Sequence, residues 1–249
     1  MLIPVKVLQR FWRVTPSGVV HVGAHSAEEL RDYETYGFGP VVWVEAQPNL
    51  VSELKMRIEA PSEVLEALVW DTSGERMSLK VTNNGQSSSV FEFGTHVIDY
   101  PEIEVVDEIS LSTKRLDEIL PRDFHHNFLN IDIQGAEYQA LKGLGLLIKR
   151  FNYIYLEVNR GQVYNGINQV VDIDSLLEES GFLRVATVWT SASWGDALYM
   201  KRDLADLVFG GRFGLRVRIV LFGIWKNQVL RNLYRRLVKK LLVKSRQLI

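Results

Sequence analysis

Acidic residues follow several predicted strands of this 249-residue chain, at the point where each strand ends. Glu45, Asp71, Asp132 and Glu157 each come at or just after an apolar run. In an open α/β sheet the carboxyl ends of parallel strands meet at one edge, and ligands bind in the crevice there. A carboxylate at that edge can accept hydrogen bonds from a ligand, and it can act as a general base if burial or a neighbouring acid raises its pKa. We therefore expect these four carboxylates to lie along one ligand-binding rim.

The first predicted strand, 19–22, runs into a turn made of Gly23, Ala24 and His25. Gly23 leaves the backbone uncovered just past the strand end, where a ligand can approach closely. Glu45 follows Gly23 by roughly 20 residues, the spacing at which a carboxylate at the end of the second strand binds ribose hydroxyls. The turn lacks the full G-x-G-x-x-G pattern, and a solvated strand-end acid is the alternative interpretation of Glu45.

The remaining acids each have two interpretations. Asp71 could bind an adenine amino group, although the sequence Asp-Thr-Ser-Gly also fits an Asx turn. Asp132 is expected to end the first strand beyond the reversal point of the sheet, so that its carboxylate would face both a cofactor and a substrate. Glu137 lies at the start of the next helix, where it could act in catalysis or bind backbone donors as a plain helix-start acid.

The histidines of the chain, which has no cysteine, do not form a pattern typical of a metal site. His21 lies inside the first strand and is interpreted as a buried structural side chain, whereas His25 lies in the turn beside the expected cofactor. His125 and His126 precede the fourth core strand at its amino end, away from the rim. The chain has no cysteine and no H-x-x-x-H cluster, so we expect no zinc site, although the acids could hold a hard cation such as magnesium.

The elements that position these residues alternate along the chain, which indicates a mostly parallel α/β sheet with helices on both faces. Strands are expected at 19–22, 41–45, 64–70, 128–133 and 153–158, with a closing antiparallel hairpin at 182–190 and 197–201. Helices are expected within 1–15 and at 26–37, 48–59, 114–120, 135–148 and 170–180. Ser26 is expected to cap its helix, with Glu28 and Glu29 in the first turn. Residues 78–112 lack helical periodicity and predict strand pieces with a functional loop around 83–89.

The composition is that of one large globular domain, with 47% hydrophobic and 24% charged residues. The amino-terminal residues contain no apolar run with a cleavage site, so we expect a cytoplasmic protein. Charge is distributed unevenly. Residues 201–249 carry 13 basic and 2 acidic residues, which leaves 16 basic and 28 acidic residues in 1–200, for net charges of +11 and -12. We expect a domain at 1–203 and a basic extension at 204–249.

The basic extension predicts an amphipathic helix. Its apolar stretch 216–225 is too short and too close to arginines to span a bilayer. Beyond it, Leu233, Leu237 and Leu241 recur on one side while Arg231, Arg235, Arg236, Lys239 and Lys240 lie elsewhere. This pattern favours a helix at the surface of an anionic membrane, so the protein would be peripheral at the inner membrane surface. A helix packed on the catalytic domain or on a second copy in a homodimer is the alternative.

Several motifs along 19–202 resemble those of FkbM-type S-adenosylmethionine-dependent methyltransferases. They are the loop 21–25 (His-Val-Gly-Ala-His) with Glu28 and Glu29, the block 43–48 (Trp-Val-Glu-Ala-Gln-Pro), the serines 87–89, the element 115–117 (Arg-Leu-Asp), the block 130–137 (Asn-Ile-Asp-Ile-Gln-Gly-Ala-Glu), and 157–159 (Glu-Val-Asn) with Tyr164. Three departures stand out. His21 replaces a frequent Asp, Ser26-Ala27 replaces a second glycine position, and Gln134 replaces a common Glu.

The resemblance implies a Rossmann-like, seven-stranded class I methyltransferase sheet and S-adenosylmethionine-dependent O-methylation of a hydroxyl in a sugar, glycan or secondary metabolite. We expect cofactor contacts from His21, Gly23, Ala24, His25, Glu45, Ala46, Asp71 and Asp132, and the catalytic candidates are Asp132, Glu137 and Glu157. A non-catalytic binding module recruited through the basic tail is the alternative function. Methylation of nucleic acid is disfavoured, because no Asn/Asp-Pro-Pro-Tyr/Phe element follows the fourth core strand.

Overall fold

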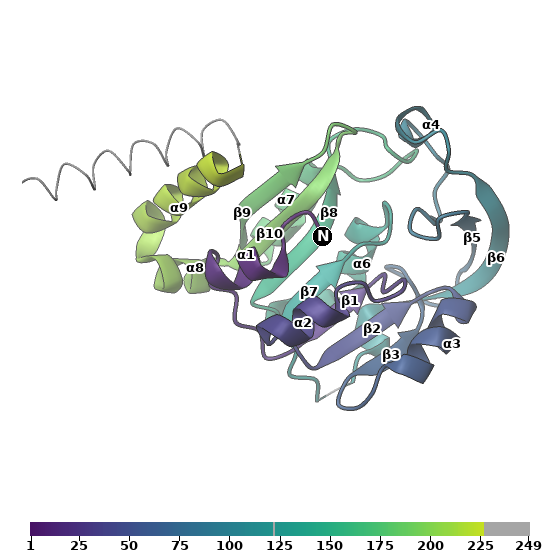
Figure 1. Cartoon of the computed structure of the whole chain (residues 1–249), viewed down its shortest axis with the longest axis horizontal. Coiled ribbons are helices and arrows are strands. Elements are labelled where there is room, and N and C mark those ends of the chain that lie inside the picture. The colour runs from purple at the N-terminus through teal and green to yellow at the C-terminus, as the bar shows by residue number, and fades with distance from the viewer. Residues whose placement is uncertain (122, 227–249) are drawn as a thin grey trace, which may run out of the picture. The chain divides into compact units, whose positions relative to one another are not determined.

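The computed structural model describes residues 1–121 and 123–226, and the chain divides into two compact units, one of Met1–Arg202 and one that begins at Asp203. Within the described residues, the first unit contains a seven-stranded sheet with the order β3-β2-β1-β7-β8-β10-β9 (Figure 1). Its strands are β1 (Val19–Val22), β2 (Val41–Glu45), β3 (Glu63–Glu66), β7 (Phe128–Ile131), β8 (Tyr153–Asn159), β9 (Phe182–Trp189) and β10 (Trp194–Lys201).

The central strands are parallel and buried. Every residue of β1, β2, β7 and β8 is buried, as expected for a parallel sheet that is covered on both faces. β10 runs antiparallel between β8 and β9, so the predicted closing hairpin is confirmed. The sheet is therefore mostly parallel with one reversed strand.

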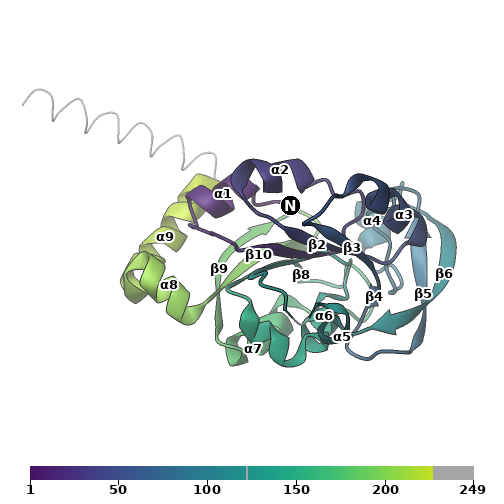
Figure 2. The same cartoon turned by 90° about the horizontal axis from the view of Figure 1, so that it is seen from below.

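Helices cover both faces of this sheet (Figure 2). On one face lie α1 (Val5–Arg10), α2 (Leu30–Tyr36) and α3 (Pro48–Arg57), and on the other lie α5 (Leu116–Ile119), α6 (Glu137–Gly143) and α7 (Val170–Glu179). A 3₁₀ helix at Gly145–Arg150 follows α6, so the helix predicted for 135–148 is divided. The apolar core includes Leu141 and Leu144 packed with strand residues such as Ile131 and Leu156.

The helix after β1 begins later than the sequence predicted. α2 starts at Leu30 with Glu29 as its N-cap residue, and no side-chain hydrogen bond caps it, so Ser26 is not a cap and Glu28 lies outside the helix. The turn residues His25 and Ala27 have positive φ angles of 45° and 53°, which no helix can include. The chain uses these residues to form an irregular loop over the strand end instead.

A second, three-stranded sheet of the described residues has the order β4-β6-β5 and extends beyond the main one (Figure 1). Its strands are β4 (Leu68–Val69), β5 (Arg76–Thr82) and β6 (Val105–Lys114), and the connection 83–104 contains α4 (His96–Asp99). The strand predicted at 64–70 is therefore two strands, because the chain leaves the main sheet after Glu66 and then pairs with β6. The strand pieces predicted within 78–112 are present.

The second unit, taken by itself, is helical in its described part. α8 (Arg202–Phe209) is followed by α9 (Gly211–Lys226), which includes the predicted apolar stretch 216–225. In the part of the chain that the structure describes, no helix is long and apolar enough to cross a bilayer. The amphipathic pattern predicted beyond 226, with Leu233, Leu237 and Leu241, lies outside the described residues.

Candidate functional site

The strand register brings the predicted rim residues into one row. Val44, Val22, Ile131 and Leu156 are aligned across β2, β1, β7 and β8. The next residue of each strand or strand end is Glu45, Gly23, Asp132 and Glu157, and β10 adds Asp196 directly opposite Glu157. Residues aligned across a sheet point to the same face. Gly23 and Asp132, more than a hundred residues apart in the sequence, therefore meet at one edge.

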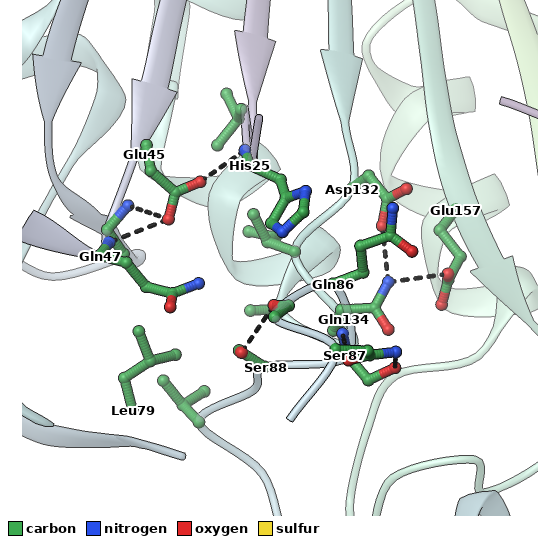
Figure 3. A pocket seen from close by; sticks show the side chains of 18 of the residues that line it. His25, Glu45, Gln47, Leu79, Gln86, Ser87, Ser88, Asp132, Gln134 and Glu157 are labelled. Atoms are coloured by element: carbon green, nitrogen blue, oxygen red, sulfur yellow. Dashed lines mark hydrogen bonds between the residues drawn. The ribbon is translucent and has the colours of Figure 1, made fainter. Parts of the chain in front are cut away.

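A cavity of about 520 Å³ opens at this edge, within the size range of small-molecule sites. Figure 3 shows Glu45 and Gln47 on one side of it, Asp132, Gln134 and Glu157 on the other, and His25 between them. Residues of the loop between β5 and β6, including Gln86 and Ser88, close the cavity from the side opposite the strand ends. The loop expected around 83–89 thus forms a wall of the cavity.

Gly23 allows the turn after β1 to pack closely against the backbone that follows β7. Its φ angle is 87°, and a Cβ atom added there would lie 1.8 Å from the carbonyl oxygen of Asp132. The amides of Gly23 and Ala24 both donate to the carbonyl oxygen of Val44, at 2.9 and 3.0 Å. Gly23 and His25 line the cavity, whereas Ala24 is buried and is not among the residues that line it.

Glu45 is held by the backbone at the end of β2. Its Oε1 accepts hydrogen bonds from the amides of Ala46 and Gln47, both at 2.9 Å, and its Oε2 accepts one from the amide of His25 at 2.7 Å. Two carboxylate oxygens offer about four acceptor sites, so one remains on Oε2 for a ligand. The carboxylate is fixed in place, and it faces the cavity together with Ala46.

His25 and Glu28 connect the cofactor-side loop to the opposite wall. The His25 Nδ1 atom lies 2.7 Å from Oε1 of Glu28, and the Gln86 side-chain amide donates to the same oxygen at 3.1 Å. Burial opposes ionisation of Glu28, but these hydrogen bonds outweigh it and lower its pKa to about 2. The negatively charged Glu28 therefore links the β5–β6 connection, through Gln86, to His25 in the turn after β1.

Asp132 and Glu157 share one amide donor. The Gln134 Nε2 atom donates to Oδ1 of Asp132 at 2.7 Å and to Oε2 of Glu157 at 3.2 Å (Figure 3). The Tyr164 hydroxyl donates to Oε1 of Gln134 at 2.6 Å, which sets the orientation of the amide. Burial and the nearby charge of Asp196 raise the pKa of Asp132 to about 6, although its side chain is open to the cavity. A carboxylate with this pKa is suited to accept a proton near neutral pH.

Glu137 is a helix-start acid in this structure. Its Oε1 accepts from the amide of Ile133 at 3.0 Å, and both of its oxygens accept from the amide of Gly135 at 3.2 and 3.1 Å. Its side chain is buried behind the turn that carries Gln134 and is not among the described residues that line the cavity. The contacts support the backbone-binding interpretation rather than direct catalysis by Glu137.

Asp71 lies outside the cavity, in contrast to the prediction. Its Oδ2 is 2.5 Å from Nζ of Lys142, and its pKa is lowered mainly by that hydrogen bond. The residue of the third strand that aligns with Glu45 is Glu66, because β3 ends there and β4 turns away into the second sheet. This placement does not support the predicted contact with adenine.

His21 combines a structural environment with a place at the cavity. Its ring stacks on Trp43 with centroids 4.9 Å apart, and its Nδ1 lies 3.3 Å from both the Tyr33 hydroxyl and the Asn130 amide nitrogen. Burial lowers its pKa, so the ring is neutral. His21 nevertheless lines the cavity floor behind Gly23.

Several residues that line the cavity were not singled out from the sequence. They are His96 and Tyr100 of the second sheet's connection, Trp194 and Asp196 of β10, and Leu2 near the chain start. The Leu2 amide donates to Oδ2 of Asp196 at 2.5 Å, and the Tyr155 hydroxyl donates to the same oxygen. Asp196 had a sequence signal, because it is an isolated acid within an otherwise apolar strand; the others depend on loop placement.

The strand order, the glycine turn after β1 and the acid at the end of β2 together define a class I S-adenosylmethionine-dependent methyltransferase fold. The sequence profile described as the methyltransferase FkbM domain matches residues 21–184, about two thirds of the chain. The chain belongs to this family, and its cofactor is S-adenosylmethionine.

A comparison with curated proteins finds no match. Among solved structures, the chain is similar to a SAM-dependent methyltransferase from Aquifex aeolicus, with 15% identity, a TM-score of 0.45, and coverage of 80% of this chain and 89% of the other. It is also similar to a NADB-Rossmann superfamily protein from Streptococcus agalactiae, with 12% identity, a TM-score of 0.48, and coverage of 97% and 86%.

The cavity fits this cofactor. Gly23 lines the cavity, so a ligand can approach its backbone at the end of β1, and the direction that a side chain would take is occupied by the Asp132 carbonyl. The remaining acceptor site of Glu45 is available to a hydroxyl donor such as a ribose. Among the residues predicted to contact the cofactor, His21, Gly23, His25, Glu45, Ala46 and Asp132 line the cavity, while Ala24 and Asp71 do not.

Proposed function

We propose that this methyltransferase transfers a methyl group to a hydroxyl of a sugar, glycan or other hydroxylated metabolite, with Asp132 as the general base. The observation that carries the proposal is the state of Asp132, which is open to the cavity and has its pKa raised to about 6. S-adenosylmethionine supplies a methyl group on a sulfonium, which is already a strong electrophile. The protein then has to align the hydroxyl and accept its proton.

Residues of the row divide into two roles. Gly23, His25, Glu45 and Ala46 lie on the side where the cofactor would bind, and Glu45 would accept hydrogen bonds from its ribose. Asp132 lies between this side and Glu157, where it can take the proton of a hydroxyl. Gln134 holds the carboxylate through one amide hydrogen and leaves the other Asp132 oxygen for the acceptor.

A cofactor-turnover screen tests the reaction. Purified protein is incubated with S-adenosylmethionine and panels of sugars, glycans and small hydroxylated metabolites, and methylated products are located by mass spectrometry and NMR. We expect O-methyl products from the wild type and a loss of about 100-fold or more in Asp132→Asn, which keeps the shape but cannot accept the proton. Equal rates in the two proteins, or products methylated only on nitrogen or carbon, would contradict the proposal.

Calorimetry tests the cofactor side separately. Glu45→Ala is expected to weaken S-adenosylmethionine binding about tenfold or more, because three amides lose the acceptor that orders the loop. The matched control is Glu66→Ala, since Glu66 aligns with Glu45 on β3 but is exposed outside the cavity. Wild-type protein that binds no S-adenosylmethionine would favour the non-catalytic binding module instead.

We further propose that α9 places the protein at an anionic membrane surface. Phe213, Val217 and Val220 follow one face of the helix and are 82%, 42% and 62% exposed. The helix contains Arg212, Arg216, Arg218 and Lys226 and no acidic residue. An exposed apolar stripe flanked by basic residues is typical of interfacial helices.

Flotation with vesicles that contain anionic lipid tests this placement in the full chain. Phe213→Glu combined with Val220→Glu is expected to abolish flotation, because both changes put charge on the apolar face. Met56→Glu is the control, since Met56 is equally exposed in the first unit, at 82%. If the double variant floats like the wild type, or if no protein floats, α9 is not a membrane-binding helix.

A further inference from the structure

Two carboxylates face each other across neighbouring strands at the far end of the row. Glu157 of β8 and Asp196 of β10 are directly opposite in the antiparallel register, both line the cavity, and each residue is 5% exposed. Like charges directly opposite in a sheet are destabilising. Burial raises the pKa of both carboxyls, and the charge of Asp132 adds to the effect at Glu157. Among the described residues, the Met1 amino group is the positive charge that acts on Asp196, and it acts on Asp132 as well.

The donors around this pair are neutral and already engaged. Gln134 divides its two amide hydrogens between Asp132 and Glu157, and Asn159 donates to Oε1 of Glu157 at 3.2 Å. The Leu2 amide and the Tyr155 hydroxyl both donate to Asp196. The amino group of Met1 also lines the cavity; it lies 3.5 Å from Glu29, and its single charge is shared among Glu29, Asp196 and Asp132. Within the described part of the chain, no lysine or arginine lines the cavity. This end of the cavity is therefore rich in hydrogen-bond acceptors and poor in donors.

His96 adds a polar side chain to the lining of the same cavity. It lines the cavity with only 4% of its surface exposed, and its Nδ1 has no hydrogen-bond partner among the described residues. Its ring packs against Phe93, Tyr100 and Tyr164, with centroids 4.5, 5.1 and 5.4 Å apart. Burial lowers its pKa, so the ring is neutral and offers a lone pair. A buried polar atom without a partner costs free energy that a ligand can restore.

Aromatic rings line the same cavity as the acid pair. The Trp194 indole nitrogen donates to the Tyr100 hydroxyl at 3.0 Å, which fixes both rings beside His96. The faces of tryptophan and tyrosine rings attract cations. In the described residues, no three histidines, aspartates or glutamates converge in a way that could hold a metal ion. The site is therefore built for an organic cation.

We propose that the methyl acceptor carries an ammonium group, which binds between the Glu157–Asp196 pair and the wall formed by His96, Tyr100 and Trp194. The proposal rests on the proposed function and defines its substrate class as an amino alcohol or amino sugar. An ammonium group has three N–H donors, which match the free acceptors, and its positive charge would favour the ionised form of the two carboxyls, which burial disfavours in its absence. Phosphorylated or carboxylated acceptors are disfavoured, because they would bring further negative charge to buried carboxyls.

A matched series of small probes tests the proposal with the full chain saturated with S-adenosylhomocysteine, so that acids used by the cofactor are already engaged. The probes are trans-2-aminocyclohexanol, trans-cyclohexane-1,2-diol and trans-2-hydroxycyclohexanecarboxylate, which share one ring and differ in charge. Calorimetry is expected to show binding of the amine about tenfold or more tighter than the diol, and no binding of the carboxylate. A diol or carboxylate that binds as tightly as the amine, or an amine that does not bind, overturns the proposal.

Two variants identify the groups responsible. Glu157→Gln is expected to weaken the amine about tenfold and leave the diol unchanged, because it removes charge but keeps a hydrogen-bond acceptor. His96→Phe keeps the ring packing but removes the nitrogen, so it is expected to weaken the amine as well. Binding of S-adenosylhomocysteine and thermal melting show whether each variant is folded. If Glu157→Gln is unfolded, Asp196→Asn is used in its place. Amine binding equal to wild type in folded variants contradicts the proposed site.

Product analysis separates this proposal from the proposed function. Methylation of the amine nitrogen rather than a hydroxyl would overturn O-methyl transfer while leaving the ammonium site in place. Conversely, O-methylation of neutral acceptors together with equal binding of amine and diol would support the reaction and overturn the ammonium site.

Discussion

The backbone of Asp132 occupies the space in which a side chain at Gly23 would begin, because a Cβ atom at Gly23 would lie 1.8 Å from the Asp132 carbonyl oxygen. The turn after β1 and the turn after β7 are thus in direct backbone contact. Because the first turn lies on the side proposed for the cofactor and the second carries Asp132, a change at Gly23 would displace both.

Gly23→Ala is expected to lower the free energy of unfolding by about 3 kcal/mol, because the methyl group meets backbone that cannot move independently and the φ angle is positive. Gly37→Ala is the control. Gly37 also has a positive φ, 71°, but none of the described atoms lies within 4 Å of its added Cβ, so the cost should be about 1 kcal/mol. Urea denaturation measures both, and equal losses would show that contact with Asp132 is unimportant.

Asp132 should make stability depend on pH in a defined window. Its pKa is raised from an ordinary 3.8 to about 6, so the folded protein binds this proton more tightly than the unfolded chain. The resulting stabilisation is present below about pH 4 and is lost as pH rises towards 6. The melting temperature of the wild type should therefore fall more steeply with pH between about 4 and 6 than that of Asp132→Asn. Glu63→Gln, at an exposed acid of β3, should leave the wild-type slope unchanged.

Tyr164→Phe should raise the pKa of Asp132, although Tyr164 acts on Asp132 only through Gln134. The Tyr164 hydroxyl holds Oε1 of Gln134 at 2.6 Å and so directs the amide hydrogens to the acids. Without it the amide can rotate, and Asp132 loses the hydrogen bond that favours its charged form. The rise of methyl transfer with pH, centred near pH 6 in the wild type, should shift upward in the variant. Tyr36→Phe, at the end of α2, is the control, and coincident profiles for all three proteins would exclude this role.

Gln86→Ala should loosen the cavity wall. It removes the hydrogen bond from Gln86 to Glu28, which is one of the contacts between the β5–β6 connection and the loop after β1. Hydrogen exchange of the amides in 84–88 is expected to increase several-fold in the absence of cofactor, since local opening depends on few such contacts. Ser78→Ala, on β5, removes a surface hydrogen bond to Glu108 and should leave these amides unaffected. Unchanged exchange in Gln86→Ala would show that other contacts hold the loop.

The sequence predicts the central sheet well because its strands are buried on both faces and read as continuous apolar runs. The same patterns place Gly23, Glu45, Asp132 and Glu157 at one edge, and the register aligns them in one row. Asp71 lies away from this row, and the apolar run 64–70 gives no sign that the chain changes sheets after Glu66. Apolar strands of two different sheets have the same hydrophobic pattern.

Residues of the cavity wall could not be found from periodicity. His96 lies in a four-residue helix inside a long connection, and its position depends on backbone hydrogen bonds with 162–163. Gln134 stands out in the sequence only as a departure from the family pattern, whereas its role depends on the turn that directs one amide to two acids and on Tyr164. Such contacts join distant segments, and a single sequence does not record them.

The groups that line the cavity come partly from the main sheet and partly from the connection within the second sheet. Groups placed to hold the cofactor, such as Gly23 and Glu45, belong to the main sheet, whereas His96 and Tyr100 belong to the connection between β5 and β6. That connection begins and ends in one antiparallel hairpin, so it can vary in length and sequence while the main sheet keeps its register. Exchange of 83–104 between family members would then change the part of the acceptor wall that His96 and Tyr100 form and leave cofactor affinity with the recipient.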